Sequence, residues 1–197
     1  MIENIGMIAT VVLGFLGMIL GYSFQRLQLK LKQREDERKE IYKKLNDFYG
    51  PVQQYLRKSE VLYKRFASTR PDGFRTLVAL LEGEKFEGND AVLLEQIIEI
   101  IVEVEKLILT QGGLIDDREI RDLFAKAGTH FRILQLAYHG KLKGDVERFE
   151  GYVYPRELNQ VIEDEIQKRK ARLDELNTVE DGLGRVFQWL RESLEEL

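Results

Sequence analysis

The sequence predicts an all-α protein in which a single N-terminal transmembrane helix continues into a cytosolic helical bundle of about six helices. Three observations lead to this prediction. Residues 5–24 contain no charged side chain, and the 197-residue chain contains only three prolines. Through most of the remaining chain, apolar residues recur at the three- and four-residue spacing of amphipathic helices, without the alternation that is typical of strands.

Residues 5–24 predict a helix that spans a membrane. A helix of this length is about 30 Å long, which matches the hydrocarbon core of a bilayer. A buried helix of a soluble protein rarely runs this far without a charged residue. A signal peptide is disfavoured because Glu3 makes the preceding stretch acidic and no small-residue cleavage site follows Phe24. We therefore divide the chain into an anchor (1–24), a charged neck (25–49) and a cytosolic domain (50–197).

Four basic residues follow the apolar segment: Arg26, Lys30, Lys32 and Arg34. Only Glu3 carries charge before it. Because positive residues stay on the cytoplasmic side, we expect the N-terminus outside the cell and the C-terminal domain in the cytoplasm, with the anchor in the plasma (inner) membrane. The same basic cluster is suited to anionic lipid headgroups, so the bilayer itself is an expected partner.

Glycines within the anchor share one helical face. Gly14, Gly17 and Gly21 are three and four residues apart, and Gly6 and Thr10 extend the stripe. Small residues let two helix backbones approach closely in lipid, so this face predicts a homo-oligomer. The alternative is that glycine is simply frequent in membrane helices.

In the neck, apolar residues continue at Leu27, Leu31 and Ile41, with Arg34 and Arg38 at two positions of the same seam. This spacing predicts that the anchor helix runs on as one rod to about Tyr49, where Gly50-Pro51 ends it. Two interpretations of the seam stay open. It forms a short coiled coil, or the helix packs on its own domain.

Beyond the neck, helical spacing predicts helices over about residues 51–66, 74–82, 90–109, 117–139, 155–176 and 184–196. The third is the most apolar, and its polar residues form only a narrow stripe. We therefore expect it at the centre of the bundle. Its deeply buried residues should include Ile97, Ile101, Val104 and Ile108.

The composition of the chain excludes several kinds of partner and catalytic site. The net charge of −4 argues against a nucleic-acid partner, and the absence of cysteine excludes disulfides, thiolate metal sites and thiol nucleophiles. His130 and His139 are nine residues apart in one predicted helix, which does not match a zinc motif. No serine lies in a GxSxG setting. We therefore expect no enzyme activity, no cofactor and no metal.

Two further segments have features of ligand sites. The run Gly112-Gly113-Leu114-Ile115-Asp116-Asp117 resembles a phosphate-binding loop, but its two aspartates would repel an anion, so a helix stop followed by a helix cap explains it. Aromatic and basic residues of the segment 42–66 could instead line a pocket for an anionic ligand. Their three- to four-residue spacing is more typical of a core.

Several stretches resemble bacterial membrane-anchored helical proteins, which have one transmembrane helix and a helical cytosolic domain. They are Tyr42 to Val52, Gly112 to Asp116, His130-Phe131-Arg132 and Tyr152 to Leu158. The resemblance implies a bacterial inner-membrane setting and brings no activity or catalytic residue. Proteins of this layout often serve as effector or accessory components of bacterial defence and stress systems, which is an analogy at the level of architecture.

These observations favour one function and leave two alternatives. We expect a membrane-tethered interaction module, or scaffold, that oligomerises through its transmembrane helix and recruits a cytosolic protein. The first alternative is a membrane-perturbing effector that forms a pore. The second is a small-ligand sensor or enzyme that uses the aromatic and basic helix.

Overall fold

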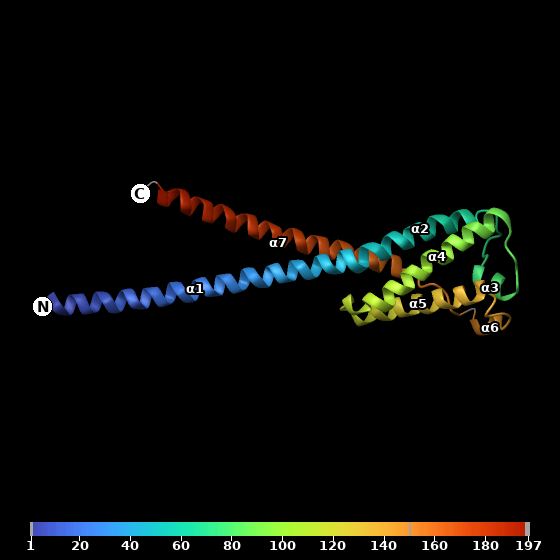
Figure 1. Ribbon diagram of the computed structural model, residues 1–197, viewed down its shortest axis with the longest axis horizontal. Helices are drawn as coiled ribbons and strands as arrows, with labels where there is room; N and C mark the ends of the chain where they lie inside the picture. Colours follow the sequence, from blue (N-terminus) through green and yellow to red (C-terminus); the bar gives the residue numbers. More distant parts are fainter. Residues whose placement is uncertain (1, 150, 196–197) are drawn as a thin grey trace. The chain divides into compact units, whose positions relative to one another are not determined.

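The computed structural model describes the backbone of residues 2–149 and 151–195, and the side chains of residues 14, 17–19, 21–149 and 151–178. Within this part all regular structure is helical and no strand occurs, so the all-α prediction is confirmed (Figure 1). In chain order the elements are α1 (Ile2–Lys44), the π-helix η1 (Leu45–Tyr49), α2 (Gly50–Ala67), α3 (Thr76–Leu81), α4 (Gly88–Gln111), the 3₁₀-helix η2 (Gly112–Leu114), α5 (Arg118–Tyr138), α6 (Val146–Phe149) and α7 (Glu157–Glu195).

The chain divides into two compact units. The first, which we call the arm, comprises Met1–Tyr42 and Leu173–Leu197. The second, the body, comprises Lys43–Arg172. The helices α1 and α7 each belong to both units, because their sequences cross from arm to body near Lys43 and Arg172.

The body is built around α4, which packs against α2, α5 and η1. This arrangement confirms the predicted central helix. Ile97, Ile101 and Val104 are buried as expected, whereas Ile108 is only half-buried. Side chains that are almost fully buried come from η1, α2, α4, α5, α7 and the loops between them, and include Phe48, Tyr49, Val52, Phe66, Leu94, Val104, Ile115, Phe124, Leu158 and Ile162.

The predicted break at Gly50-Pro51 is wrong, because the helix continues through both residues. Gly50 has helical dihedral angles and donates its N–H to the carbonyl of Leu45, five residues earlier. In an α-helix the ring of Pro51 would clash with the carbonyl four residues before it. A wider π-turn just ahead of the proline accommodates the ring, so α1, η1 and α2 follow one another without a loop.

Two boundaries near the C-terminus also differ from the prediction. The separate helices expected over 155–176 and 184–196 form one helix, α7. No proline interrupts the chain between them, and Thr178 bonds the carbonyl of Asp174 within the helix. A short helix, α6, lies between the helices expected over 117–139 and 155–176, where the sequence predicted no helix. Polar composition alone did not reveal this single turn.

In the arm, the described side chains of α1 are covered along the predicted seam. Leu27, Leu31, Arg34 and Arg38 are half-buried and Ile41 is buried, while most residues between them are exposed. The 3.5-residue spacing therefore identified the covered face of the helix correctly.

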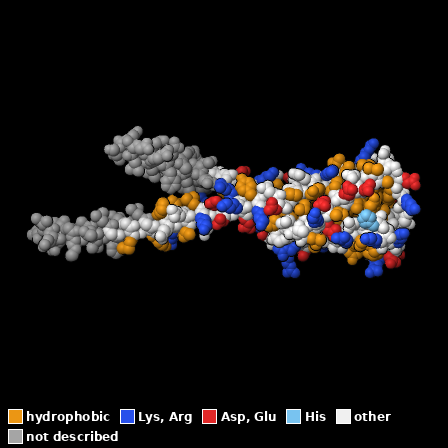
Figure 2. Space-filling view, in the orientation of Figure 1, with side chains coloured by type: hydrophobic (Ala, Val, Ile, Leu, Met, Phe, Trp, Pro, Cys, Tyr) orange, Lys and Arg blue, Asp and Glu red, His pale blue; other side chains and the backbone are white. Residues whose placement is uncertain are grey.

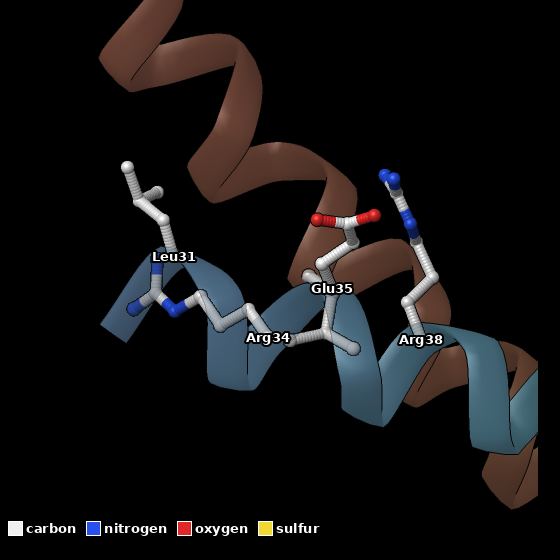
Figure 3. A pocket seen from close by; sticks show the side chains of 5 residues that line it. Leu31, Arg34, Glu35 and Arg38 are labelled. Carbon is white, nitrogen blue, oxygen red and sulfur yellow. The ribbon is translucent and has the colours of Figure 1, made fainter. Parts of the chain in front are cut away.

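The residues that α7 contributes to the arm show where this face packs. Leu173 and Leu176 are buried, and Leu176 shares a hollow with Leu31 and Arg34 of α1 (Figure 3). This part of the covered face therefore lies beside α7 of the same chain, and both interpretations of the neck stay predictions.

No helix is both long and apolar enough to cross a membrane within the part of the chain that the structure describes. Most side chains of the predicted anchor, residues 5–24, lie outside that part.

Candidate functional site

Charged residues meet inside the body at the point where α1 ends. Lys44 is only 8% exposed, and its Nζ donates to both carboxylate oxygens of Asp116, at 2.8 and 2.7 Å. Arg169 of α7 is equally buried and donates to the same carboxylate at 3.4 Å. Asp116 thus connects the end of α1 to α7. We call Lys44, Tyr49, Asp116, Glu165 and Arg169 the junction cluster.

The guanidinium of Arg169 is held on two further sides. It pairs with the carboxylate of Glu165, one turn earlier on α7. Its central carbon lies 4.4 Å from the centre of the Tyr49 ring, within the range of a cation–π interaction. A buried guanidinium is tolerated only when charge and hydrogen bonds compensate it, and these contacts supply both.

Tyr49 is fully buried, and its hydroxyl has no hydrogen-bond partner among the described residues. Burial raises the pKa of Tyr49 to about 12, although the positive charge of Arg169 acts in the opposite direction. The ring also packs against Phe48 and Phe124, with ring centres 5.1 and 6.5 Å away. The junction cluster is therefore a polar group set directly against the aromatic core.

Local sequence explains how Asp116 is presented. Gly112 and Gly113 belong to the turn after α4, and Asp117 then caps α5 by accepting from the backbone N–H groups of Glu119 and Ile120. Because Asp117 fills the cap position, the adjacent Asp116 can reach Lys44 and Arg169. The sequence predicted a cap at one of these aspartates. It gave no sign of the ion pair, whose partners are 72 residues apart.

The charged groups of the junction cluster form ion pairs that link two helices. Each of its four charged groups faces an opposite charge, and Asp116 alone is well exposed, at 63%. Breaking a buried ion pair from one side typically costs about 3–5 kcal/mol, because the remaining charge is left without compensation. The cluster can therefore hold the end of α1 against α7 within the body.

The two histidines are placed differently from each other. His130 is half-buried, its Nδ1 lies 2.7 Å from the carbonyl oxygen of Tyr152, and burial lowers its pKa. Its ring lies 6.2 Å from that of Tyr154, so it helps to fix the segment before α7. His139 is exposed at the end of α5. No group of histidine, aspartate and glutamate side chains among the described residues could hold a metal ion.

The aromatic residues considered as a ligand pocket separate into two clusters and a surface group. Phe48 and Tyr49 join Phe124 beside the junction cluster. Phe66 instead packs against Phe74 and Phe86, while Tyr42 and Tyr63 are exposed. These side chains therefore do not converge on one cavity.

Arg70 covers the second aromatic cluster. Its guanidinium carbon lies 5.0–5.4 Å from the ring centres of Phe66, Phe74 and Phe86. It also pairs with Glu84 at 3.1 Å and with Asp90 at 2.6 Å. Arg70 thus links the turn after α2 to the loop before α4 and to the first turn of α4, so its role is structural.

Two of the hollows in the described part are shallow. One, of about 170 Å³, lies in the arm between Leu31, Arg34, Glu35, Arg38 and Leu176 (Figure 3). The other, of about 200 Å³, lies in the body beside Gly73 and Val78. Sites for small molecules usually have volumes of about 300–1,000 Å³. Neither hollow is the size of such a site.

The residues predicted to contact the membrane or a second copy of the chain lie on the surface of α1. Gly14, Gly17 and Gly21 are exposed, and a methyl group added to any of them would meet no atom within 4 Å. Both roles stay predictions. In the basic cluster Arg26, Lys30 and Lys32 are exposed, Arg34 is half-buried, and Arg26 stacks on Tyr22 at 4.6 Å.

Comparison with known proteins finds no matching family model, no matching curated protein and no matching solved structure.

Proposed function

We propose that the protein is a membrane-tethered interaction module: α1 anchors and oligomerises it, and the body binds a cytosolic protein. One observation supports the anchor above others. Large apolar side chains of α1 are exposed where the structure describes them, with Met18 at 64%, Ile19 at 59%, Tyr22 at 56% and Phe24 at 57% (Figure 2).

Leaving such side chains in water is unfavourable. Burying one large apolar side chain contributes roughly 1.5–3 kcal/mol, so the exposed face of α1 favours an apolar environment. Residues 5–24 carry no charge over a length that matches a bilayer. Lipid would therefore cover this face along its whole length.

The residues after this segment suit the membrane–water interface. Tyrosine is enriched at this level, and Arg26 stacks on Tyr22 with its charge beside the ring. Lys30 and Lys32 follow with exposed side chains. We therefore place the N-terminus outside the cell and the body in the cytoplasm, at the inner membrane.

The body supports binding of a protein better than catalysis. Its described hollows are small, and the charged groups of its junction cluster are matched by opposite charges. Its visible surface mixes charged and apolar side chains without one dominant patch (Figure 2). The glycine face of α1 would bring two or more bodies together, which would strengthen binding to a multivalent partner.

Membrane fractionation tests the anchor. The full-length protein should stay in the membrane pellet through alkaline carbonate and high-salt washes. The matched control is a variant that lacks residues 2–24 and keeps the basic cluster, and it should appear in the supernatant as a helical protein. If the full-length protein washes off with salt, the attachment is electrostatic and the proposal fails.

Membrane potential separates the interaction module from a pore-forming effector. Induced expression of the full-length protein should leave a voltage-sensitive dye signal and growth unchanged. Depolarisation that disappears when residues 2–24 are deleted would contradict the module and favour the pore.

A further inference from the structure

We propose that three exposed cations around Leu29 of α1 bind the headgroups of anionic phospholipids, so that the protein selects the lipid beside its anchor. The site consists of Arg26, Lys30 and Lys32, whose side chains are exposed. Arg34, the fourth basic residue of the predicted cluster, does not belong to it. The inference rests on the proposed function, because it requires α1 to lie in a bilayer.

Helical spacing gathers the three cations around Leu29. Arg26, Leu29 and Lys32 follow one another at intervals of three residues, and Lys30 comes four residues after Arg26. Residues three and four apart are neighbours on the surface of a helix. Leu29 is therefore flanked by positive charge, while its own side chain is 61% exposed.

No carboxylate among the described residues neutralises these cations. The chain has no acidic residue between Glu3 and Glu35, and Glu35 pairs with Lys39 at 2.6 Å. Arg26 instead stacks on a ring, with its guanidinium carbon 4.6 Å from the ring centre of Tyr22. Three positive charges without a negative one complement an anionic ligand, and phosphate oxygens accept strong hydrogen bonds from such groups.

The position of the site along α1 matches the headgroup layer of a bilayer. This layer is about 5–8 Å thick on each side of the hydrocarbon core. At the rise of an α-helix, Leu29 lies about 7.5 Å beyond Phe24, the last residue of the predicted anchor. An apolar side chain is favourable near the boundary between headgroups and acyl chains, and the long stems of lysine and arginine let their charges reach the phosphates.

Arg34 differs from the other three basic residues in two ways. It is half-buried and lines the hollow that it shares with Leu31 and with Leu176 of α7 (Figure 3). It also lies about 15 Å beyond Phe24 along the helix, outside the headgroup layer. The predicted cluster of four therefore reduces to a lipid site of three.

Fluorescence quenching by labelled lipids can test this site, because the chain has no natural cysteine. Gln25→Cys, an exposed position one turn before Leu29, carries a fluorophore in the full-length protein. The protein is reconstituted in vesicles of phosphatidylglycerol and phosphatidylcholine, in which one lipid or the other bears a nitroxide on its acyl chain near the headgroup. We expect labelled phosphatidylglycerol to quench more strongly than the same mole fraction of labelled phosphatidylcholine.

Single substitutions should separate the site from the rest of the cluster. Lys30→Gln and Lys32→Gln should each lower the preference for phosphatidylglycerol by about fivefold, the factor expected for one charge near an anionic surface. Arg34→Gln is the matched control and should lower it by less than about twofold, because its charge lies farther from the lipid phosphates and is screened by salt.

Equal quenching by the two lipids would overturn the inference and leave the anchor intact. An equal loss of preference in Arg34→Gln and in the two lysine variants would also overturn it, because the charge would then act without regard to position. Absence of quenching by both lipids would show that position 25 is not beside a bilayer, and would contradict the proposed function as well.

Discussion

At Gly50 the backbone leaves no room for a side chain, because a Cβ would lie 2.7 Å from the carbonyl oxygen of Leu45. Gly50→Ala should therefore lower the free energy of unfolding by about 1–3 kcal/mol, the usual cost of forcing a group into a packed site. Denaturant unfolding of the full-length protein in detergent, followed by circular dichroism, measures this change.

Gly128 is the matched control for that measurement. It lies inside α5, and a Cβ there would meet Ile108 at 3.9 Å, an ordinary contact. Gly128→Ala should stabilise the protein by about 0.5–1 kcal/mol, because alanine is a better helix former. Equal stability of Gly50→Ala and wild type would show that the π-turn is not a feature of the folded protein.

Tyr49 makes stability depend on high pH. Its pKa is raised to about 12 in the folded state by burial, against an ordinary value of about 10 in the unfolded chain. Between these values the unfolded chain loses the phenolic proton and the folded protein keeps it, so the free energy of unfolding falls as pH rises, in total by on the order of 2 kcal/mol.

Tyr49→Phe removes this contribution and should make the stability curve flatter above pH 10. Tyr154, whose pKa burial also raises, keeps part of the slope in the variant. Unfolding midpoints measured from pH 8 to pH 11 compare the two proteins. Curves of equal steepness would mean that the Tyr49 hydroxyl reaches solvent in the folded protein.

For single residues, the sequence correctly predicted burial and helix capping, which depend mainly on residues nearby in the chain. Burial of Ile97, Ile101 and Val104 followed from helical spacing, and a cap at Asp116 or Asp117 followed from the turn before α5. The contacts of Asp116 with Lys44 and Arg169 depend on residues brought together only by folding, so no local pattern indicated them.

For the elements, spacing predicted the covered faces better than the ends of helices. The seam of α1 was identified correctly, while the expected breaks at Gly50-Pro51 and before residue 184 were wrong. Glycine and proline weaken a helix by amounts that packing can offset. The end of a helix therefore depends on tertiary contacts that the sequence does not display.

At the level of a single helix, the testable prediction is that α1 associates through its glycine face. Gly17→Leu should hold two helices apart and weaken association, while membrane insertion is retained because leucine is more apolar than glycine. No atom lies within 4 Å of a methyl group added at Gly17, so the change should not disturb the fold of its own chain. Size-exclusion chromatography with light scattering in detergent should show a smaller species.

Val12→Leu introduces the same side chain in the same segment at a position outside the glycine stripe, so it serves as the control and should keep the wild-type mass. If Gly17→Leu also keeps that mass, the glycines do not form the interface. Assembly would then depend on the body, or the protein would be a monomer.

At the scale of the whole molecule, the sequence predicted the all-α class and the central place of α4. The division into anchor, neck and domain that the sequence predicts does not coincide with the arm and the body. The arm also includes the C-terminal part of α7. Helical spacing assigns a face to each helix but does not say which distant helix will cover it. The partnership of α1 with α7 was therefore not predictable.

The central claim is that the chain crosses a membrane once with its body in the cytoplasm, and labelling of single cysteines in intact cells tests it most directly. Glu3→Cys should react with a membrane-impermeant maleimide in intact cells. Lys168→Cys, at an exposed site on α7, should react only after the cells are permeabilised. The reverse pattern would invert the orientation, and protection of both positions until permeabilisation would contradict a membrane-spanning anchor.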